Sequence, residues 1–217
     1  MLGIGGSERA GGNTDIALDQ AGRIVRSRGA RFDSVQLRDH TISPCSPCGD
    51  CNSRTIPCTV PDDTPAIVAR MKEADAIIYA TPVHGFGLAH LMQIFIEHAG
   101  VGYLRFDRPL ANKVGGVIIT SRRYSDSNVY HQLVDNIMLN RMIMVGSGFP
   151  ALMRNSSPQA GMFDAESLDA LERMVHRMVD MTELLRDQTA AHGEPVLPTV
   201  DINERVARPR NAAAATP

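Results

Sequence analysis

Continuous apolar runs that alternate with amphipathic segments are the feature that most constrains how this chain can fold. Residues 76–81 (AIIYAT) and 114–120 (VGGVIIT) lack the regular exchange of apolar and polar residues that is typical of a strand with one face in water. Between them, residues 88–98 repeat apolar side chains every three to four positions, which is the spacing of one helix face. Strands of a parallel sheet are apolar throughout because helices cover both of their faces. The pattern therefore predicts strand–helix units around a buried parallel sheet.

Five such units are expected along the chain. The predicted strands are residues 1–6, 32–37, 76–81, 114–120 and 142–146. The predicted helices are residues 14–28, 64 to about 73, 88–98, 129–139 and about 165–185. Thr64 followed by proline, and Asp164, are expected N-caps, and Gly29 is a typical helix stop.

Successive strand–helix units with right-handed crossovers leave few possible topologies. We expect an α/β fold with a doubly wound, five-stranded parallel sheet of strand order 2-1-3-4-5 and a cysteine-rich loop, residues 44–62, after strand 2. Residues 1–186 are predicted to form one domain. Residues 187–217, which are rich in proline and alanine and lack apolar periodicity, are predicted to be an extended or disordered tail.

The four cysteines of the chain lie close together in sequence. Cys45, Cys48, Cys51 and Cys58 follow the spacing C-x2-C-x2-C-x6-C. Iron–sulfur clusters are held by four cysteine thiolates in compact runs of this kind. A structural zinc site more often uses two C-x2-C pairs with a longer spacer, and disulfides are typical of small secreted proteins. The spacing favours a cluster, while zinc and unligated thiols remain open alternatives.

Three loops at the expected carboxyl ends of strands 1, 3 and 4 carry candidate ligand-binding residues, because ligands of doubly wound sheets bind there. Residues 5–14 (GGSERAGGNT) combine glycines with short donors ahead of a helix, which favours a phosphate group. Residues 81–87 (TPVHGFG) suit a planar ring, and residues 120–127 (TSRRYSDS) offer an aromatic ring and two arginines. Each loop is equally compatible with a polar turn that binds nothing. The candidate catalytic residues are His84 and Tyr124. The candidate cofactor-binding residues are Ser7, Arg9, Gly12, Asn13, Thr14, Pro82, Val83, His84, Gly85, Thr120, Ser121, Arg122 and Tyr124.

Charge and hydropathy bear on the partners of the protein. A net charge of −2 gives no basic surface for nucleic acid. No apolar run reaches the about 18 residues that a membrane span needs, and no apolar leader with a basic flank is seen. We therefore expect a cytoplasmic protein that binds neither nucleic acid nor membrane.

The three loops and the cysteine run together resemble one protein family. GGSERAGGNT resembles the GS-x-R-x-x-GNT phosphate loop of NAD(P)H-dependent FMN reductases, a branch of the flavodoxin-like superfamily. TPVHGFGLAHLMQIFIEH resembles the [ST]PVY…K-x-FID segment of the same family. The cysteine run followed by PDD is similar to the motif that iron–sulfur flavoproteins carry between strand 2 and helix 2. The resemblance covers about residues 1–185, with the motifs in the order of the family.

This resemblance implies a flavodoxin-like fold that binds FMN. By position in the motifs, Ser7, Arg9, Asn13 and Thr14 would hold the phosphate, and residues 82–85 would line the isoalloxazine ring. The four cysteines would ligate a [4Fe–4S] cluster. The resemblance also implies a homodimer or homotetramer with flavin and cluster near a subunit interface, and NAD(P)H as a candidate reductant.

The expected function is that of an FMN-dependent oxidoreductase. Its [4Fe–4S] cluster would transfer electrons between a reductant, the flavin and a small-molecule or protein acceptor. Two alternatives stay open. One is an NAD(P)H:FMN or quinone reductase without a cluster, and the other is a non-enzymatic electron carrier like flavodoxin.

Overall fold

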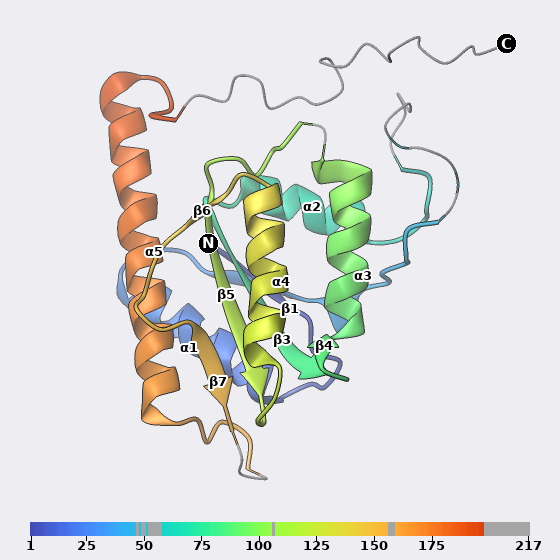
Figure 1. Cartoon of the computed structure of the whole chain (residues 1–217). Coiled ribbons are helices and arrows are strands. Elements are labelled where there is room, and N and C mark those ends of the chain that lie inside the picture. Colours follow the sequence, from blue (N-terminus) through green and yellow to red (C-terminus); the bar gives the residue numbers. More distant parts are fainter. Residues whose placement is uncertain (47, 49–50, 52–57, 106, 156–158, 198–217) are drawn as a thin grey trace, which may run out of the picture.

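A parallel β-sheet with helices on both faces organises the protein (Figure 1). The computed structural model describes residues 1–46, 48, 51, 58–105, 107–155 and 159–197. Across the sheet the strands run in the order β2 (Asp33–Gln36), β1 (Leu2–Gly5), β3 (Ala76–His84), β5 (Val114–Ser121) and β6 (Ile143–Met144). Each neighbouring pair in this order is parallel. The predicted strands 4 and 5 correspond to β5 and β6, so the predicted fold class and the strand order 2-1-3-4-5 are confirmed.

The fifth position of the sheet is divided between two short strands. β6 pairs with the beginning of β5, and β7 (Ala151–Arg154) pairs with its end, both in parallel. The intervening segment contains Gly148, whose φ of 91° favours glycine, and Pro150, which has no N–H for a ladder. These residues interrupt the strand. β7 was absent from the sequence-based prediction, which placed a single strand at residues 142–146.

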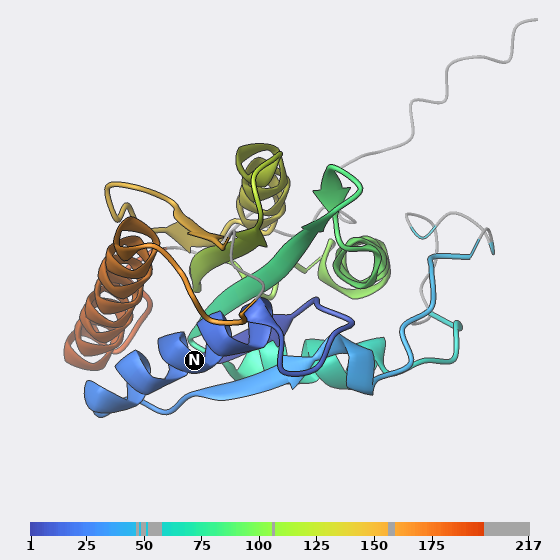
Figure 2. The ribbon, with the colours of Figure 1, turned by 90° about the horizontal axis from the view of Figure 1, so that it is seen from below.

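The helices form one layer on each side of the sheet. They are α1 (Asn13–Ser27), α2 (Thr64–Glu73), α3 (His90–Ala99), α4 (Asp126–Leu139) and α5 (Ala165–His192), with the short 3-10 helix η1 (Leu37–Asp39) and the π-helix η3 (Gly100–Leu104). Buried side chains of α1 and α5 pack on one face, and those of α2, α3 and α4 pack on the other. Figure 2 shows the two layers from below.

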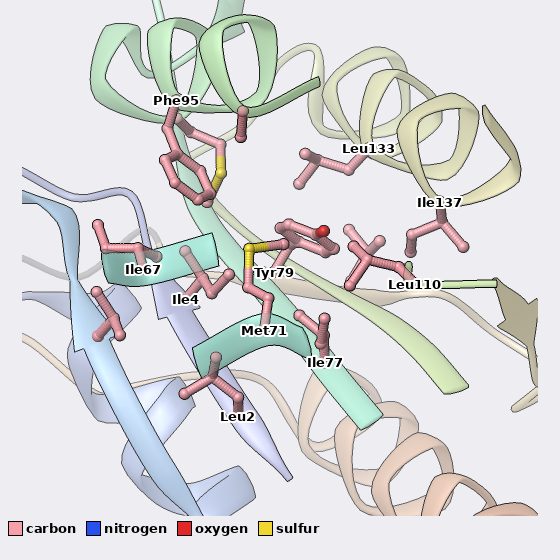
Figure 3. Packing of buried hydrophobic residues seen from close by; sticks show 14 of the residues in the cluster. Leu2, Ile4, Ile67, Met71, Ile77, Tyr79, Phe95, Leu110, Leu133 and Ile137 are labelled. Atoms are coloured by element: carbon pink, nitrogen blue, oxygen red, sulfur yellow. The ribbon is translucent and has the colours of Figure 1, made fainter. Parts of the chain in front are cut away.

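The apolar side chains that recur along each helix pack against the sheet, on both of its faces. Figure 3 shows Ile4, Ile77 and Tyr79 of the sheet with Met71 of α2, Phe95 of α3 and Ile137 of α4. All six side chains are fully buried. Burial of one such side chain contributes about 1.5–3 kcal/mol, so this face holds much of the stability that keeps the strand ends in place.

Helix boundaries differ from the predictions at several ends. Thr64 is the first helical residue rather than the N-cap of α2; the cap is Asp63. Asp164 does cap α5, since its Oδ1 accepts from the N–H of Ser167 at 2.7 Å. α5 continues to His192, where Gly193 at φ 76° ends it. Residues 187–192 of the expected tail are therefore helical, and residues 198–217 lie outside the described part of the chain.

The loop expected after β3 is a small hairpin. β3 extends to His84 and turns back into β4 (Gly87–Leu88), with Val83 opposite Leu88 and His84 opposite Gly87. Gly85 and Phe86 form the two-residue turn with φ of 52° and 66°, as a type I′ turn requires at both positions. Within the described ranges, no helix is long and apolar enough to cross a membrane.

Candidate functional site

A cleft of about 860 Å³ opens where β1, β3 and β5 end. Its volume falls within the about 300–1,000 Å³ of small-molecule sites, and its place is the switch point of the sheet. Eleven of the candidate cofactor-binding residues line it: Ser7, Arg9, Gly12, Asn13, Thr14, Pro82, Val83, His84, Thr120, Ser121 and Arg122. The cleft therefore brings together three loops that lie far apart in the sequence.

The first loop ends at the N-terminus of α1 inside the cleft. Gly12 is the N-cap, and no side chain among the described residues caps this end. The backbone N–H groups of the first turn are thus left to bind an anion, and the helix dipole favours negative charge there. Gly11 has φ of 66°, and no described heavy atom would meet a Cβ there within 4 Å. The backbone is therefore open to close approach by a ligand.

A mostly buried ion pair supports this loop. Arg38, in η1, donates from Nη1 and Nη2 to the two carboxylate oxygens of Asp15, each at 2.9 Å. The same Asp15 accepts the N–H of Gly11 at 2.7 Å, while Arg38 also donates to the carbonyl of Ser7 at 3.3 Å. Bidentate pairing fixes both side chains. The pair therefore connects both ends of the anion-binding loop to η1, which follows β2.

Two further contacts close the floor of the cleft. The hydroxyl groups of Thr14 and Thr120 lie 2.7 Å apart and are buried. The Asn13 side-chain oxygen accepts from the N–H of Gly161 at 2.8 Å, which leaves its NH₂ group for a ligand. Thr14, Thr120 and Asn13 therefore hold neighbouring segments together in addition to lining the cleft.

The β3–β4 hairpin forms the second wall. Pro82, Val83 and His84 line the cleft, whereas Gly85 at the turn does not. Phe86 is 71% exposed, and its ring lies 6.4 Å from that of Tyr124, which is 65% exposed. Neither ring lines the cleft. Of the two candidate catalytic residues, the structure places His84 in the cleft lining and Tyr124 outside it.

Asp126 orders the third loop. Its carboxylate accepts from Nε of Arg154 at 2.7 Å, from the hydroxyl of Ser121 at 3.2 Å and from the N–H of Ser127 at 2.8 Å. Burial acts to raise the pKa of this carboxyl, but the Arg154 hydrogen bond and charge, with the other donors, hold the pKa below its usual value. The carboxylate therefore holds Ser121 at the edge of the cleft.

Five residues that line the cleft were not among the candidates predicted from the sequence. They are Glu8, Gly11, Asn155, Gln159 and Ala160. Glu8 and Gly11 lie inside the glycine-rich loop, which the sequence already indicated as a ligand-binding segment. The other three follow β7, and recognising a short strand ahead of the turn-forming run NSSPQAG would have indicated them. Residues 156–158 of that run lie outside the described residues.

Cys58, at the end of the cysteine run, contacts α3 through His98. Burial raises the pKa of the Cys45 thiol, and the charges of Cys51, Glu97, Cys58 and Cys48 raise it further. The other three cysteines are thus near enough to Cys45 to affect its thiol. Among the described residues, however, no three Cys, His, Asp or Glu side chains converge as a metal site. The predicted ligands share one loop but do not surround a common centre in this structure.

The cleft and the cysteine loop contact opposite ends of α3. His90 at the start of α3 pairs with Glu8 of the cleft, Nε2 to Oε1 at 2.7 Å. His98 near the helix end contacts the sulfur of Cys58 at 3.3 Å. At 1.5 Å per residue these histidines are separated by about 12 Å along the helix axis. Within one chain the two candidate sites are therefore distinct.

This chain matches a known protein family and several known proteins. The family model of NADPH-dependent FMN reductases matches residues 1–155. An iron–sulfur flavoprotein of Methanocaldococcus jannaschii is 30% identical over 152 residues, which cover 69% of this chain and 77% of the relative. An iron–sulfur flavoprotein of Methanosarcina thermophila is 29% identical over 191 residues, which cover 86% of this chain and 96% of the relative.

Solved structures show the same fold. RosB with bound 8-demethyl-8-formylriboflavin-5'-phosphate superposes with a TM-score of 0.66 at 17% identity, over 100% of this chain and 95% of that one. A flavodoxin from the domain Archaea superposes with a TM-score of 0.55 at 12% identity, over 84% of this chain and 99% of that one. At these identities the likeness establishes the fold, which is flavodoxin-like.

Proposed function

This chain belongs to the NADPH-dependent FMN reductase family and is an FMN-dependent oxidoreductase, and from that premise we propose that it also carries a [4Fe–4S] cluster on its cysteine loop. The cluster would exchange electrons with the flavin one at a time, while a reductant such as NAD(P)H and an acceptor complete the reaction. The observation that carries the proposal is the pairing of a cleft suited to a phosphate with four free cysteines in one short segment of the chain.

The cleft fits FMN. The uncapped start of α1 and the open position of Gly11 suit a phosphate group, with Ser7, Asn13 and Thr14 as side-chain donors around it. Arg9 and Arg122 line the same cleft and supply positive charge toward the anion. Pro82 and Val83, beside His84, form a wall for the ring. Bound FMN supplies the interconversion of two-electron and one-electron transfer.

The roles of individual residues at the ring follow from their placement. We propose that His84, which lines the cleft, donates or accepts a hydrogen bond at the ring or at a substrate. Tyr124 is exposed, lies two residues after Arg122 of the cleft lining and contacts Phe86, so we propose that it contacts the substrate rather than the phosphate end of the flavin.

The four cysteines are ligands of the type that a [4Fe–4S] cluster requires. Four thiols supply the four thiolates that a [4Fe–4S] cluster requires, and no disulfide joins them among the described residues. Cys45, Cys51 and Cys58 are partly buried, which suits ligands that must be shielded from water. The four described sulfurs do not surround one centre in this structure, so iron binding would require them to come together as the thiols lose their protons.

We further propose that the protein acts as a homodimer or homotetramer in the cytoplasm. The cleft and Cys58 lie at opposite ends of α3 in one chain. An oligomer, as the resemblance to iron–sulfur flavoproteins implies, would allow the cysteine loop of one subunit to face the flavin of another. Size-exclusion chromatography with light scattering measures this directly, and a monomer under all conditions would contradict it.

One experiment tests the cluster. The chain is purified without oxygen, and its visible spectrum, iron content, sulfide content and FMN content are measured. We expect flavin absorbance with an additional broad shoulder in the visible range from thiolate-bound iron. A matched variant with Ser at positions 45, 48, 51 and 58 should lose the shoulder and the iron but keep FMN. A wild-type preparation that contains FMN and no iron would refute the cluster.

A second candidate function is an NAD(P)H:FMN or quinone reductase that has no cluster. It is favoured by the match of residues 1–155 to the family model of NADPH-dependent FMN reductases. The same four-serine variant decides between the two. Loss of NAD(P)H-dependent turnover with FMN retained supports the cluster enzyme, and turnover at the wild-type rate supports the simple reductase.

A further inference from the structure

A buried asparagine that was not among the sequence-based candidates links the anion-binding loop to the segment after β7. Asn155 lines the cleft, and only 6% of the residue is exposed. Its backbone N–H donates to the carbonyl of Ser121 at 3.1 Å, at the end of β5. Its side-chain nitrogen Nδ2 donates to the carbonyl of Gln159 at 2.8 Å and lies 3.4 Å from Oδ1 of Asn13. Asn155 therefore connects the end of β5 with the first residue of α1.

Backbone groups determine which way the two side-chain amides point. A side-chain amide has an acceptor oxygen on one side and an NH₂ donor on the other. The carbonyl of Gln159 can only accept, so the nitrogen of the Asn155 amide faces it. The N–H of Gly161 can only donate, and it lies 2.8 Å from Oδ1 of Asn13. Oδ1 of Asn13 therefore faces two donors, and the NH₂ group of Asn13 remains for a ligand in the cleft that this residue lines.

Close packing on α1 holds this arrangement in place. Gly161 has φ of 81°, a backbone conformation that favours glycine. A Cβ at this position would lie 3.4 Å from both Cδ1 and Cγ2 of Ile16 in α1. The segment that carries Gly161 therefore lies directly against α1, with its N–H directed at Asn13.

The opposite orientation of the Asn13 amide would be unfavourable on both of its sides. Its NH₂ group would face two donors, the N–H of Gly161 and the NH₂ group of Asn155, instead of an acceptor. Its oxygen would face the cleft at the start of α1. Phosphate oxygens are negatively charged acceptors, so they need a donor there and not a second acceptor. The contacts with Gly161 and Asn155 therefore select the orientation that donates to an anion.

We propose that Asn155 is a positioning residue for the phosphate of FMN, because it orients the Asn13 amide so that the NH₂ group donates to the anion. This inference rests on the proposed place of the phosphate at the start of α1. Asn155 acts through Asn13 and does not itself need to touch the phosphate. Riboflavin has the same ring system but no phosphate, so the orientation of Asn13 matters for FMN alone. Asn155 thereby increases the preference of the cleft for the phosphorylated flavin.

The test measures the dissociation constants of FMN and of riboflavin on flavin-free, full-length protein by the quenching of flavin fluorescence. The variants Asn155→Ala, Asn155→Leu and Asn13→Ala, and the double variant Asn13→Ala/Asn155→Ala, are compared with wild type. Asn155→Leu removes the donor but keeps a side chain of similar size, so it repeats the measurement without leaving a void. Asn128→Ala, at an exposed position on α4, is the matched control. Circular dichroism confirms that each variant folds.

We expect Asn13→Ala to weaken FMN binding about tenfold, as the loss of a hydrogen bond to a charged group does. Asn155→Ala and Asn155→Leu should each weaken FMN binding about fivefold, because the Asn13 amide is then held by Gly161 alone. Riboflavin binding should stay close to the wild-type value in every variant. Asn128→Ala should bind both flavins as wild type does.

The double variant identifies how Asn155 acts. If Asn155 works through Asn13, the double variant should bind FMN about tenfold more weakly than wild type, as Asn13→Ala does. Independent contributions would multiply to about fiftyfold, and that result would overturn the positioning role. An equal loss of FMN and riboflavin binding in the Asn155 variants would also overturn it, since it would indicate a purely structural role.

The same measurements separate this inference from the proposed place of the phosphate. If wild type bound FMN no more tightly than riboflavin, the phosphate would not lie at the start of α1, and both proposals would be wrong. If wild type preferred FMN and the Asn155 variants kept that preference in full, the place of the phosphate would stand and the role of Asn155 would be wrong.

Discussion

At the scale of single residues, Arg38 stabilises the anion-binding loop although it does not line the cleft. Its pair with Asp15 is mostly buried, at 17% and 12% side-chain exposure, and it supports both Ser7 and Gly11. We expect Arg38→Ala to lower the free energy of unfolding by about 2 kcal/mol, between the values for exposed and buried pairs. FMN affinity should fall about tenfold because the loop loses its brace.

Arg28 provides the control for that experiment. It forms a similar contact with Asp180 at 2.7 Å, but on the surface of the molecule and away from the cleft. Urea denaturation and FMN titration of Arg28→Ala should both resemble wild type. If Arg38→Ala bound FMN as tightly as Arg28→Ala, the bracing role would be wrong.

Asp126 makes the stability of the third loop depend on pH. Its pKa in the folded protein lies below the usual value of about 3.9, because the Arg154 contacts outweigh burial. The contribution of this carboxylate is therefore fully present above about pH 4 and is lost as the pH falls through the lowered pKa. We expect Asp126→Asn to be less stable than wild type at pH 7, and the difference to shrink below about pH 4.

Urea denaturation between pH 3 and pH 7 measures this difference. Asp135→Asn, an exposed position on the same helix, shows the effect of removing any charge from α4. A difference between wild type and Asp126→Asn that stayed constant with pH would contradict the assignment.

At the scale of secondary-structure elements, β5 is the strand on which α4 and α5 converge. A Cβ on Gly115 would lie 2.9 Å from Cγ2 of Ile137 in α4, and one on Gly116 would meet Met178 of α5. Consecutive glycines therefore allow one helix to approach closely on each face. Ile137 is fully buried and branched at Cβ, so it cannot easily move aside.

We expect Gly115→Ala to destabilise the protein by about 1–3 kcal/mol, the usual cost of overpacking a core. The control is Gly100→Ala, at a helical φ of −61° where no described heavy atom lies within 4 Å of the added carbon. That change should be neutral or slightly stabilising, since alanine favours helix by up to about 1 kcal/mol. Thermal or urea unfolding measures the stability of both variants. Equal stability of Gly115→Ala and Gly100→Ala would contradict the close approach of α4 to β5.

At the scale of the whole molecule, the cleft joins the ends of three strands, so a ligand that fills it should stabilise the entire domain. At a concentration 100 times its dissociation constant, FMN should add about 2.7 kcal/mol. This corresponds to a rise in Tm of roughly 5–10 °C for a domain of this size. Riboflavin lacks the phosphate and should stabilise much less at equal concentration.

Differential scanning fluorimetry of the flavin-free protein with each ligand is the measurement. Equal shifts with riboflavin and FMN would mean that the start of α1 does not hold the phosphate. A shift with neither ligand would contradict binding in this cleft.

Much of the fold and part of the cleft could be predicted because the signals are local. The apolar runs at 76–81 and 114–120 lie at the centre of the sheet, and the loop at residues 5–14 reaches the cleft as expected. β7 and the residues after it escaped prediction, because a strand interrupted by glycine and proline leaves two stretches too short for periodicity to reveal. The contact of Tyr124 with Phe86 of the hairpin likewise joins residues far apart in the sequence, so periodicity could not reveal it.

By itself, the sequence determined the alternation of buried strands and helices, the glycine-rich anion loop and the gathering of four thiols in one segment. Only the tertiary structure decided that Arg38 pairs with Asp15 and that His98 stands between Asp62 and Cys58. The physical reason is the range of the forces involved. Backbone preference and apolar periodicity act between near neighbours in the chain, whereas a charged side chain is fixed by partners that only the packing of helices on the sheet brings within reach.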